Sequence, residues 1–302
     1  MRQRIFMGIA IAAAVMVAIG GLIVANQSGV FGGKAKHLVT LALREKDEGQ
    51  LAEAQAHLEE LVATFPDSPW ADDGLFALGQ VYEAQQQWME ARAMYQTLLD
   101  RFPESPLLAA TQTQLGQANI ALLFSPTVTE LDALYEVKPG DTLGKIASAH
   151  GTTVEFLKKA NHLKSDVIQP RLKLKVPTGR FSVVVDKSQN QLLLTENNRF
   201  IKSYGVATGK DNSTPVGTFK IVTKIPNPVW YKQDAVVPPE SPDNILGTRW
   251  MGIDKKGYGI HGSVDPNAIG HQVTAGCVRM VNSDVEELFS ILPVGAEVTI
   301  VD

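Results

Sequence analysis

A cysteine and a histidine near the C-terminus are the residues of this chain best suited to chemistry. Cys277 is the only cysteine, and His261 lies sixteen residues before it. That separation exceeds one helical turn but suits two neighbouring strand ends joined by a loop, which would bring imidazole and thiol together. Because a thiol with a pKa of about 8.5 is only a few per cent thiolate near neutral pH, a nucleophilic cysteine needs a base or a cation beside it. The alternative is that Cys277 is a small buried hydrophobic side chain.

Three further residues near Cys277 have candidate roles. Arg279 shares a face with Cys277 if the segment is a strand, and its guanidinium could then hold a substrate carboxylate. Its alternative role is an ion pair with an acidic residue of the following helix. His271 is a second candidate base on the loop between His261 and Cys277. Gly276 has no side chain, so a substrate could approach the backbone closely there.

The elements expected around these residues are mostly strands. Residues 181–302 contain short alternating segments, including a hairpin pattern over residues 181–195, and predict a mostly β domain. The stretch 225–242 is too rich in proline for a central strand, and we expect either a wall of the substrate cleft or an irregular surface crossing. After the cysteine, Ser283 and Glu286 predict a capping box. One helix follows, with an apolar face formed by Val285, Leu288, Phe289 and Leu292.

Two motifs in this region resemble those of the L,D-transpeptidase (YkuD-like) catalytic domain. The first is His261-Gly-Ser, followed by a loop and then by Thr274-Ala-Gly-Cys-Val-Arg-Met. The second is Gly205-Val-Ala-Thr-Gly-Lys, followed by Thr214-Pro-Val-Gly-Thr-Phe. Together they cover most of residues 181–302. Many members of the family carry a histidine just before the Gly-Cys pair, where this chain has an alanine.

The resemblance implies that Cys277 is the nucleophile and that His261 is the base that accepts its proton. It also implies an oxyanion hole at the turn Thr274–Cys277, with the backbone N–H groups of Gly276 and Cys277 as donors. Since Gly262 offers no side chain, we expect a backbone carbonyl to orient the imidazole. The implied reaction is attack on the L,D bond of a tetrapeptide stem, release of D-alanine and transfer of the acyl group to an amine. The alternatives are hydrolysis by an L,D-carboxypeptidase and a catalytically silent scaffold that binds peptidoglycan.

Charge is unevenly distributed along the 302 residues, whose net charge is −4. Residues 36–134 carry five basic and fifteen acidic side chains, whereas residues 135–180 carry nine basic and four acidic ones. The acidic region argues against nucleic acid as the main partner, because phosphate-binding surfaces are basic. A single cysteine excludes an intramolecular disulfide, and no group of residues has zinc-ligand spacing. We therefore expect neither a metal nor a cofactor.

The first 35 residues predict a cytoplasmic stub and an uncleaved membrane anchor. Residues 5–25 form an uncharged run of twenty-one residues, which spans about 30 Å as a helix at 1.5 Å per residue. The alternative is a cleaved signal peptide, whose apolar region is usually only about 7–15 residues long. Arg2 and Arg4 precede the run, and the next basic residue is Lys34. The positive-inside rule then predicts a cytoplasmic N-terminus. The anchor would thus lie in the inner membrane, with the rest of the chain on the periplasmic or wall side.

Residues 36–124 contain an internal repeat. Phe65-Pro-Asp-Ser-Pro recurs as Phe102-Pro-Glu-Ser-Pro thirty-seven residues later, between stretches with helical periodicity. Paired helices with a period near 34 residues resemble tetratricopeptide repeats, which stack because one pair cannot bury its own apolar face. We expect an all-α arm that either offers a concave surface to a protein partner or acts as a spacer, followed by a linker over residues 125–134. In a spacer the aromatic side chains are core residues, namely Trp70, Phe76, Tyr82, Trp88 and Tyr95.

The basic segment 135–177 predicts a small β-α-α-β module. It begins with Tyr135-Glu-Val-Lys-Pro-Gly-Asp-Thr-Leu and ends with Ile168-Gln-Pro and the strand Leu172-Lys-Leu-Lys-Val-Pro. This pattern resembles a LysM domain, which implies binding to the N-acetylglucosamine-containing glycan of peptidoglycan. Thr142 has the alternative role of a helix N-cap.

In chain order, the sequence therefore predicts a multidomain fold: a transmembrane helix, all-α repeats, a LysM module and a mostly β catalytic domain. The expected partner is peptidoglycan, whose glycan is bound by residues 135–177 and whose stem peptides are processed at Cys277. A protein partner of the repeats is a further expectation.

Overall fold

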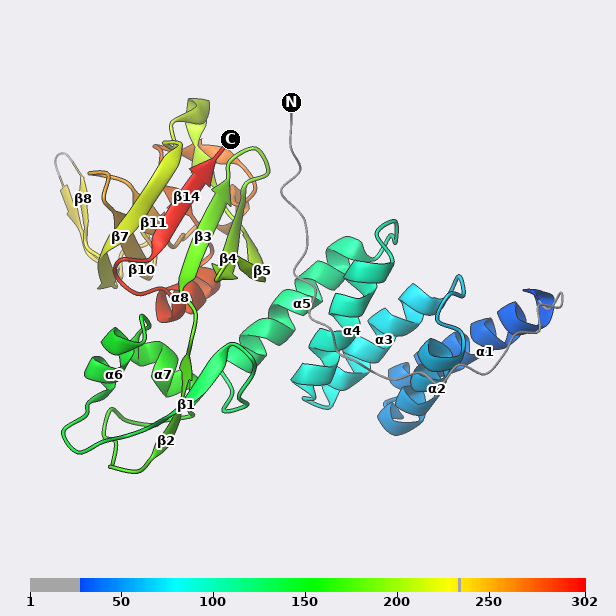
Figure 1. The fold of residues 1–302 in the computed structure, drawn as a ribbon. Helices are drawn as coiled ribbons and strands as arrows, with labels where there is room; N and C mark the ends of the chain where they lie inside the picture. The colour runs from blue at the N-terminus through cyan, green and yellow to red at the C-terminus, as the bar shows by residue number, and fades with distance from the viewer. Residues whose placement is uncertain (1–27, 233–234) are drawn as a thin grey trace.

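The computed structural model describes residues 28–232 and 235–302. The anchor expected at residues 5–25 lies outside these ranges. Within them, none of the helices combines the length and the apolar character that crossing a bilayer requires. Three units follow one another along the chain: an arm of paired helices, a small mixed module, and a β-rich unit that packs above the module in Figure 1.

The arm consists of five helices, α1 (Ser28–Asp47), α2 (Leu51–Thr64), α3 (Ala71–Ala84), α4 (Trp88–Arg101) and α5 (Leu108–Leu123). Small residues let neighbouring helices approach, because a Cβ on Gly79 would lie 2.4 Å from the ring of Tyr95. The aromatic side chains expected in the core are there: Tyr82 and Tyr95 are buried, and Trp70, Phe76 and Trp88 pack against the same cluster. These rings therefore stabilise the repeats, although Trp70, Phe76 and Trp88 are only partly buried.

The segment 125–134, which we expected to be a linker, is held by all three units. The Lys175 ammonium is buried and donates to the carbonyls of Leu122 at 2.6 Å and Ser125 at 3.1 Å. It also lies 3.4 Å from the carboxylate of Asp132. The Glu130 carboxylate binds Arg92 of the arm and Arg199 of the β-rich unit. Because buried polar groups are retained only where they find partners, this segment is a packed junction.

The arm also contacts the β-rich unit directly. Along α5, the amide of the buried Asn119 donates to the carbonyl of Ile201 at 2.9 Å. A Cβ on Gly116 would lie 3.4 Å from the Cα of Lys202, so the helix backbone lies close to the strand. The last helix of the arm is thus part of the surface on which the β-rich unit rests.

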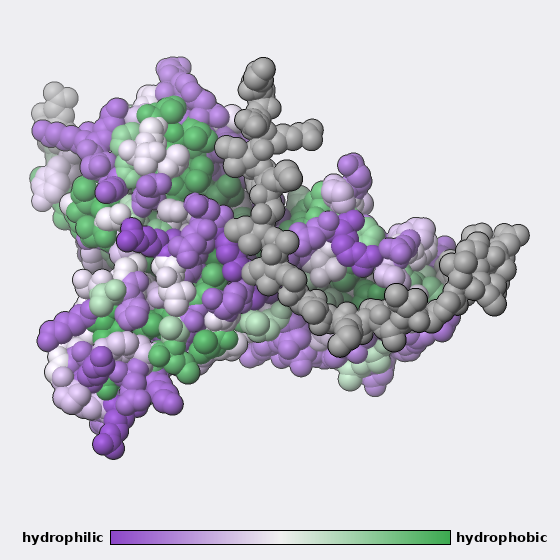
Figure 2. All heavy atoms as spheres, viewed as in Figure 1, coloured by the Kyte–Doolittle hydropathy of each residue, from purple (hydrophilic) through white to green (hydrophobic). Residues whose placement is uncertain are grey.

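The small module has the expected β-α-α-β order: β1 (Asp132–Glu136), α6 (Leu143–Ala149), α7 (Val154–Ala160) and β2 (Lys173–Pro177). Its two strands pair antiparallel. Thr142 caps α6 by accepting the N–H of Lys145 at 3.2 Å, as its position before an apolar helix predicts. Hydrophilic side chains gather at the outer end of the module, at the lower left of Figure 2.

The module and the β-rich unit share one hydrophobic core. Thr153 donates its hydroxyl proton to the carbonyl of Ser290, and the Lys159 ammonium donates to the Ser290 hydroxyl at 2.8 Å. A cavity of about 890 Å³ lies beside this contact, lined by segments 148–151, 177–182 and 293–297 together with Asn197, Asn198 and Lys220. Neither Cys277 nor His261 lines it.

The β-rich unit is built on an eight-stranded sheet with the order β13-β11-β10-β7-β14-β3-β4-β5. These strands are β3 (Phe181–Asp186), β4 (Gln191–Glu196), β5 (Arg199–Gly205), β7 (Gly217–Pro226), β10 (Arg249–Ile253), β11 (Gly259–His261), β13 (Val278–Arg279) and β14 (Glu297–Val301). The expected hairpin is β3–β4, paired antiparallel. Short parallel strands β6 (Thr208–Gly209) and β12 (Gln272–Thr274) form a separate pair.

The helix after the cysteine, α8 (Asn282–Ile291), packs against this sheet with the expected apolar face buried. The capping box predicted at Ser283 and Glu286 is wrong. The helix begins at Asn282, its N-cap is Val281, and no side chain caps it. The reason is that Asn282 accepts hydrogen bonds from other segments instead of from its own helix.

The proline-rich stretch 225–242 contains a small hairpin, β8 (Trp230–Lys232) and β9 (Ala235–Val237), which projects at the left of Figure 1. The buried Asn244 holds its base, because the Asn244 amide donates to the carbonyl of Pro228 at 2.9 Å and to that of Pro238 at 3.2 Å. Specific hydrogen bonds therefore hold the base of this hairpin at Pro228 and Pro238.

Candidate active site

Two adjacent parallel strands carry the residues with candidate chemistry. In β11 and β13, Ile260 pairs with Val278 and His261 pairs with Arg279. Ile260 and Val278 point into the core, where both are buried. Because side chains alternate along a strand, His261, Arg279 and Cys277 belong to the opposite face. The sixteen-residue separation is thus spanned by two strand ends and a loop, as expected.

His261 is held in one orientation by its own backbone. The ring is only 2% exposed, and its Nδ1 lies 2.7 Å from the carbonyl oxygen of Gly262. A carbonyl only accepts, so Nδ1 carries the proton and Nε2 is the free basic nitrogen. This is the backbone carbonyl that the sequence led us to expect. Burial and the nearby Arg279 charge, opposed by the hydrogen bond to Gly262, together lower the pKa of His261 to about 4, so the ring is neutral at neutral pH.

The thiol of Cys277 is half-buried and lies 3.6 Å from the carbonyl oxygen of Gly257, to which it donates. Burial raises the pKa of this thiol, although the positive charge of Arg279 opposes the shift. The resting pair is therefore a neutral thiol and a neutral imidazole. Such a pair forms its thiolate only as the imidazole accepts the proton, which is general-base catalysis.

The turn before the cysteine is closed by one hydroxyl. Thr274 donates its Oγ1 proton to the Cys277 carbonyl at 2.6 Å and accepts the Gly276 N–H at 3.1 Å. Of the two donors expected to form an oxyanion hole, Gly276 is thus engaged. The N–H of Cys277 has no acceptor among the residues described here. The backbone donor left to meet an oxyanion is that of Cys277.

Gly276 is required for a reason other than access of a substrate. Its φ is +122°, a region that side chains disfavour. A Cβ there would lie 2.7 Å from the Tyr258 ring and 3.1 Å from the Ser213 carbonyl. The protein's own Tyr258 therefore occupies the space that the missing side chain leaves.

The second sequence motif packs behind the first. Gly209 pairs with Thr274 across β6 and β12, and a Cβ on Gly209 would lie 2.9 Å from the Cα of Gly276. The N–H of Gly209 donates to the buried Thr214 hydroxyl at 2.7 Å. The Thr-Gly-Lys and Thr-Pro-x-Gly segments thus support the backbone of the cysteine turn.

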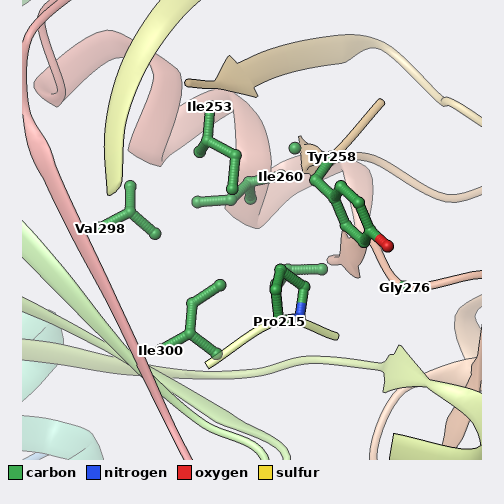
Figure 3. A pocket seen from close by; sticks show the side chains of 9 residues that line it. Pro215, Ile253, Tyr258, Ile260, Gly276, Val298 and Ile300 are labelled. Carbon is green, nitrogen blue, oxygen red and sulfur yellow. The ribbon is translucent and has the colours of Figure 1, made fainter. Parts of the chain in front are cut away.

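A cavity of only about 10 Å³ lies behind this turn, lined by side chains such as Pro215, Ile253 and Val298. Figure 3 shows these side chains pointing toward the cavity, while the hydroxyl of Tyr258 points away from it. It has room for one water molecule at most. This side of the turn is therefore packed core, and a substrate must approach from the other face.

Arg279 makes no ion pair with any described residue. Its Nε is buried without a hydrogen-bond partner. The alternative of an ion pair with the following helix is therefore not observed, since Glu287 of α8 binds Lys202 at 2.6 Å and the Tyr204 hydroxyl at 2.7 Å. The guanidinium remains available to an anionic ligand on the face of Cys277.

His271, the rival base, lies on the exposed loop and contributes its carbonyl to the N–H of Thr208. Its ring makes no hydrogen bond with a described residue. The structure therefore gives His271 no partner that would orient it as a base, unlike His261.

Two residues near His261, Trp250 and Asn282, were not predicted from the sequence to contribute to the site. Trp250 pairs with His261 across β10 and β11, and the two rings stack with their centroids 5.8 Å apart. Its indole fits because Gly252 and Gly259 lack side chains, since a Cβ on either would lie within 2.9 Å of the ring. Asn282 binds the backbone next to Gly262. In the sequence, the only sign of this packing was the presence of Gly252 and Gly259 near Trp250, because small residues leave room for a large ring.

Groups of His, Cys, Asp or Glu arranged to hold a metal ion are not found among residues 28–232 and 235–302.

Three family models match successive parts of this chain. The family model of the L,D-transpeptidase catalytic domain (YkuD) matches residues 180–300, that of the LysM domain matches residues 135–177, and a tetratricopeptide-repeat model matches residues 46–115. A crystal structure of L,D-transpeptidase 3 from Mycobacterium tuberculosis is similar with a TM-score of 0.35 and 17% identity, covering 44% of this chain and 65% of that one.

Two relatives carry names that assign them provisionally to the L,D-transpeptidases. YqjB of Bacillus subtilis is 43% identical over 126 residues, which cover 40% of this chain and 70% of that protein. YkuD of Bacillus licheniformis is 36% identical over 175 residues, which cover 55% of this chain and 98% of that protein. Because nearly the whole of that relative is matched, this chain belongs to the YkuD family of L,D-transpeptidases, with tetratricopeptide repeats and a LysM domain preceding its catalytic domain.

Proposed function

We propose that this chain is a peptidoglycan L,D-transpeptidase that uses Cys277 as nucleophile and His261 as general base. The observation that supports the proposal is that His261 lies on β11 and Cys277 directly precedes the neighbouring strand β13, with the Nδ1 of His261 bound to Gly262 and Nε2 free of any hydrogen bond to a described residue. Membership of the family supports the same reaction. The expected outcome in the cell is cross-linking or remodelling of the wall.

The reaction follows from these groups. Nε2 of His261 accepts the proton of the Cys277 thiol as the sulfur attacks the carbonyl carbon of the L,D bond. The N–H of Cys277 donates to the oxyanion that develops. The imidazolium then gives its proton to the departing amine of D-alanine, and a thioester remains. An acceptor amine attacks the thioester, passes its proton to His261, and the thiol is restored with a new amide bond.

Transfer competes with hydrolysis at the thioester stage. An amine held in line with the thioester gains a large effective molarity over water, and this positioning is what a transpeptidase must supply. The hairpin β8–β9 is the candidate wall of such a cleft, and the LysM domain would keep acceptor strands near by binding the glycan. Residues 5–25 would keep the chain at the membrane, and the repeats would bind a protein partner or act as a spacer.

One experiment tests the proposal. The full chain in detergent is incubated with a disaccharide-tetrapeptide donor, with and without a D-amino acid, and the products are identified by mass spectrometry. Cross-linked dimers and exchange products are expected, and Cys277→Ala should abolish both. Tripeptide as the dominant product at high amine concentration would show an L,D-carboxypeptidase instead. Absence of any product, with binding to peptidoglycan retained, would show a scaffold.

A further inference from the structure

Asn282 is the first residue of α8, and its side chain binds the backbone of two other segments. An asparagine at a helix N-cap commonly accepts an N–H of the first turn, but the N-cap of α8 is Val281 and Asn282 is its first helical residue. Here its Oδ1 accepts the N–H of Thr248 at 3.1 Å and the N–H of Ser263 at 3.2 Å instead. Both partners are donors, so the contacting atom is the oxygen. The amide nitrogen of Asn282 makes no hydrogen bond with a described residue.

Two glycines make room for this oxygen. A Cβ on Gly262 would lie 2.2 Å from Oδ1 of Asn282, and a Cβ on Gly247 would lie 2.3 Å from it. Gly247 also has a φ of +63°, which other residues seldom adopt. The backbone on both sides is therefore shaped around the oxygen.

The contact to Ser263 acts on the carbonyl that holds the imidazole. The N–H of Ser263 and the carbonyl of Gly262 belong to one peptide unit, which is planar and rigid. Fixing the N–H at Asn282 consequently fixes the direction of the carbonyl, which lies 2.7 Å from Nδ1 of His261. A chain of contacts thus runs from α8 through one peptide plane to the imidazole.

We propose that Asn282 is a positioning residue that orients His261 through the Gly262–Ser263 peptide. The proposal rests on the proposed function, because it assigns the fixed imidazole to the proton transfer from Cys277. Within the described residues, the hydrogen bonds of Asn282 go to Thr248 and Ser263, and none joins it to the thiol or the imidazole. Its effect is to keep the proton on Nδ1 and Nε2 aimed at the thiol, so losing it should lower kcat more than it changes KM.

The test compares two substitutions of similar size in the full chain. Asn282→Asp keeps an oxygen acceptor, whereas Asn282→Leu removes it. Asn282→Leu should lower kcat about 10- to 100-fold, the usual cost of misplacing a catalytic group by about 1 Å. Asn282→Asp should stay within about threefold of the wild type. Asn119→Leu is the matched control, because it removes another buried asparagine bond, that to Ile201, far from the site. It should lower the unfolding temperature and leave kcat unchanged.

Two measurements separate this proposal from the proposed function. The rate of Cys277 alkylation by iodoacetamide at neutral pH needs no peptide substrate, and ¹⁵N shifts of the His261 ring report which nitrogen is protonated. Asn282→Leu should slow alkylation and mix the two tautomers, even in an enzyme that transfers no acyl group. If Asn282→Leu leaves the rate and the ring shifts unchanged, the proposal is overturned. Equal loss in Asn282→Asp and Asn282→Leu would overturn it too, since the oxygen acceptor would then not be the cause.

Discussion

Trp250 stacks on His261, with ring centroids 5.8 Å apart and an interplanar angle of 23°. The two residues are direct partners across β10 and β11, so the indole covers the imidazole that we propose as the general base. The Trp250 ring and the neighbouring core residues leave the imidazole only 2% exposed to water. This burial disfavours the charged imidazolium and lowers the pKa of His261 to about 4.

Replacing Trp250 by alanine should therefore raise the pKa of His261 toward its ordinary value of 6.5. Exposure to water stabilises the charged imidazolium, so the pKa rises, and the fraction of neutral base falls at pH values below the new pKa. The acid limb of the pH profile of kcat/KM should move upward by one pH unit or more, on the order of burial-driven shifts in general. An NMR titration of the His261 ring measures this shift. Trp250→Phe keeps an aromatic cover and should move the limb less.

The choice between the two candidate bases is tested by the thiol itself. His261→Ala should slow alkylation of Cys277 by iodoacetamide at neutral pH, because a thiol with a raised pKa needs a base to become nucleophilic. His271→Ala should leave the rate nearly unchanged, since that ring is exposed and makes no hydrogen bond with a described residue. The opposite behaviour of the two variants would reassign the base.

Much of this architecture could be predicted from the sequence, because the patterns that indicate it lie within short segments of the chain. The thirty-seven-residue repeat, the β-α-α-β order of residues 135–177 and the two strand ends at His261 and Cys277 all follow from spacing and alternation. The cap at Thr142 was also predicted correctly, because an N-cap depends only on neighbouring residues, here Asp-Thr before an apolar run.

The wrong prediction of a capping box arose because distant segments compete for the side chain at the start of α8. Ser283 and Glu286 have the spacing of a capping box, but Asn282 meets Thr248 and Ser263 only after the sheet has formed. The oxyanion hole that the resemblance implies at Thr274–Cys277 stays a prediction, and in this structure the Thr274 hydroxyl accepts the Gly276 N–H. The role of residues 125–134 as a linker also stays a prediction, and their packing depends on Lys175, forty residues or more away in the sequence.

Glu196 gives the junction between the units a pH dependence. The carboxyl is fully buried, its Oε1 accepts the Gly179 N–H at 3.1 Å, and its Oε2 has no partner. Burial raises its pKa from 4.5 to about 7, with the Asp132 charge adding to the shift and Arg199 and Lys175 opposing it. Between these values the folded chain holds a proton that the unfolded chain has lost, so stability falls as pH rises through this window.

Glu196→Gln should remove that loss, because its amide stays neutral at every pH. The free energy of unfolding of this variant should exceed that of the wild type at pH 8 by up to about 3 kcal/mol, and the difference should vanish near pH 4. Urea unfolding at both pH values measures the difference. An equal difference at pH 4 and pH 8 would mean that the ionisation of Glu196 is not its source.

Arg279 should recognise a carboxylate of the donor stem. Its guanidinium lies on the face of Cys277, its Nε is buried without a partner, and no described acidic residue neutralises it. A charge-assisted hydrogen bond contributes about 1.5–3 kcal/mol, so Arg279→Gln should lower kcat/KM about 10- to 100-fold for a donor with a free terminal carboxylate. The same substitution should matter little for a donor whose terminal carboxylate is amidated, because the wild type has already lost the contact there. Both donors are compared with both enzymes, and the coupling between the two changes gives the strength of the contact. If Arg279→Gln costs the amidated donor as much as the free acid, the guanidinium acts on the His261–Cys277 pair through its charge and binds no substrate carboxylate.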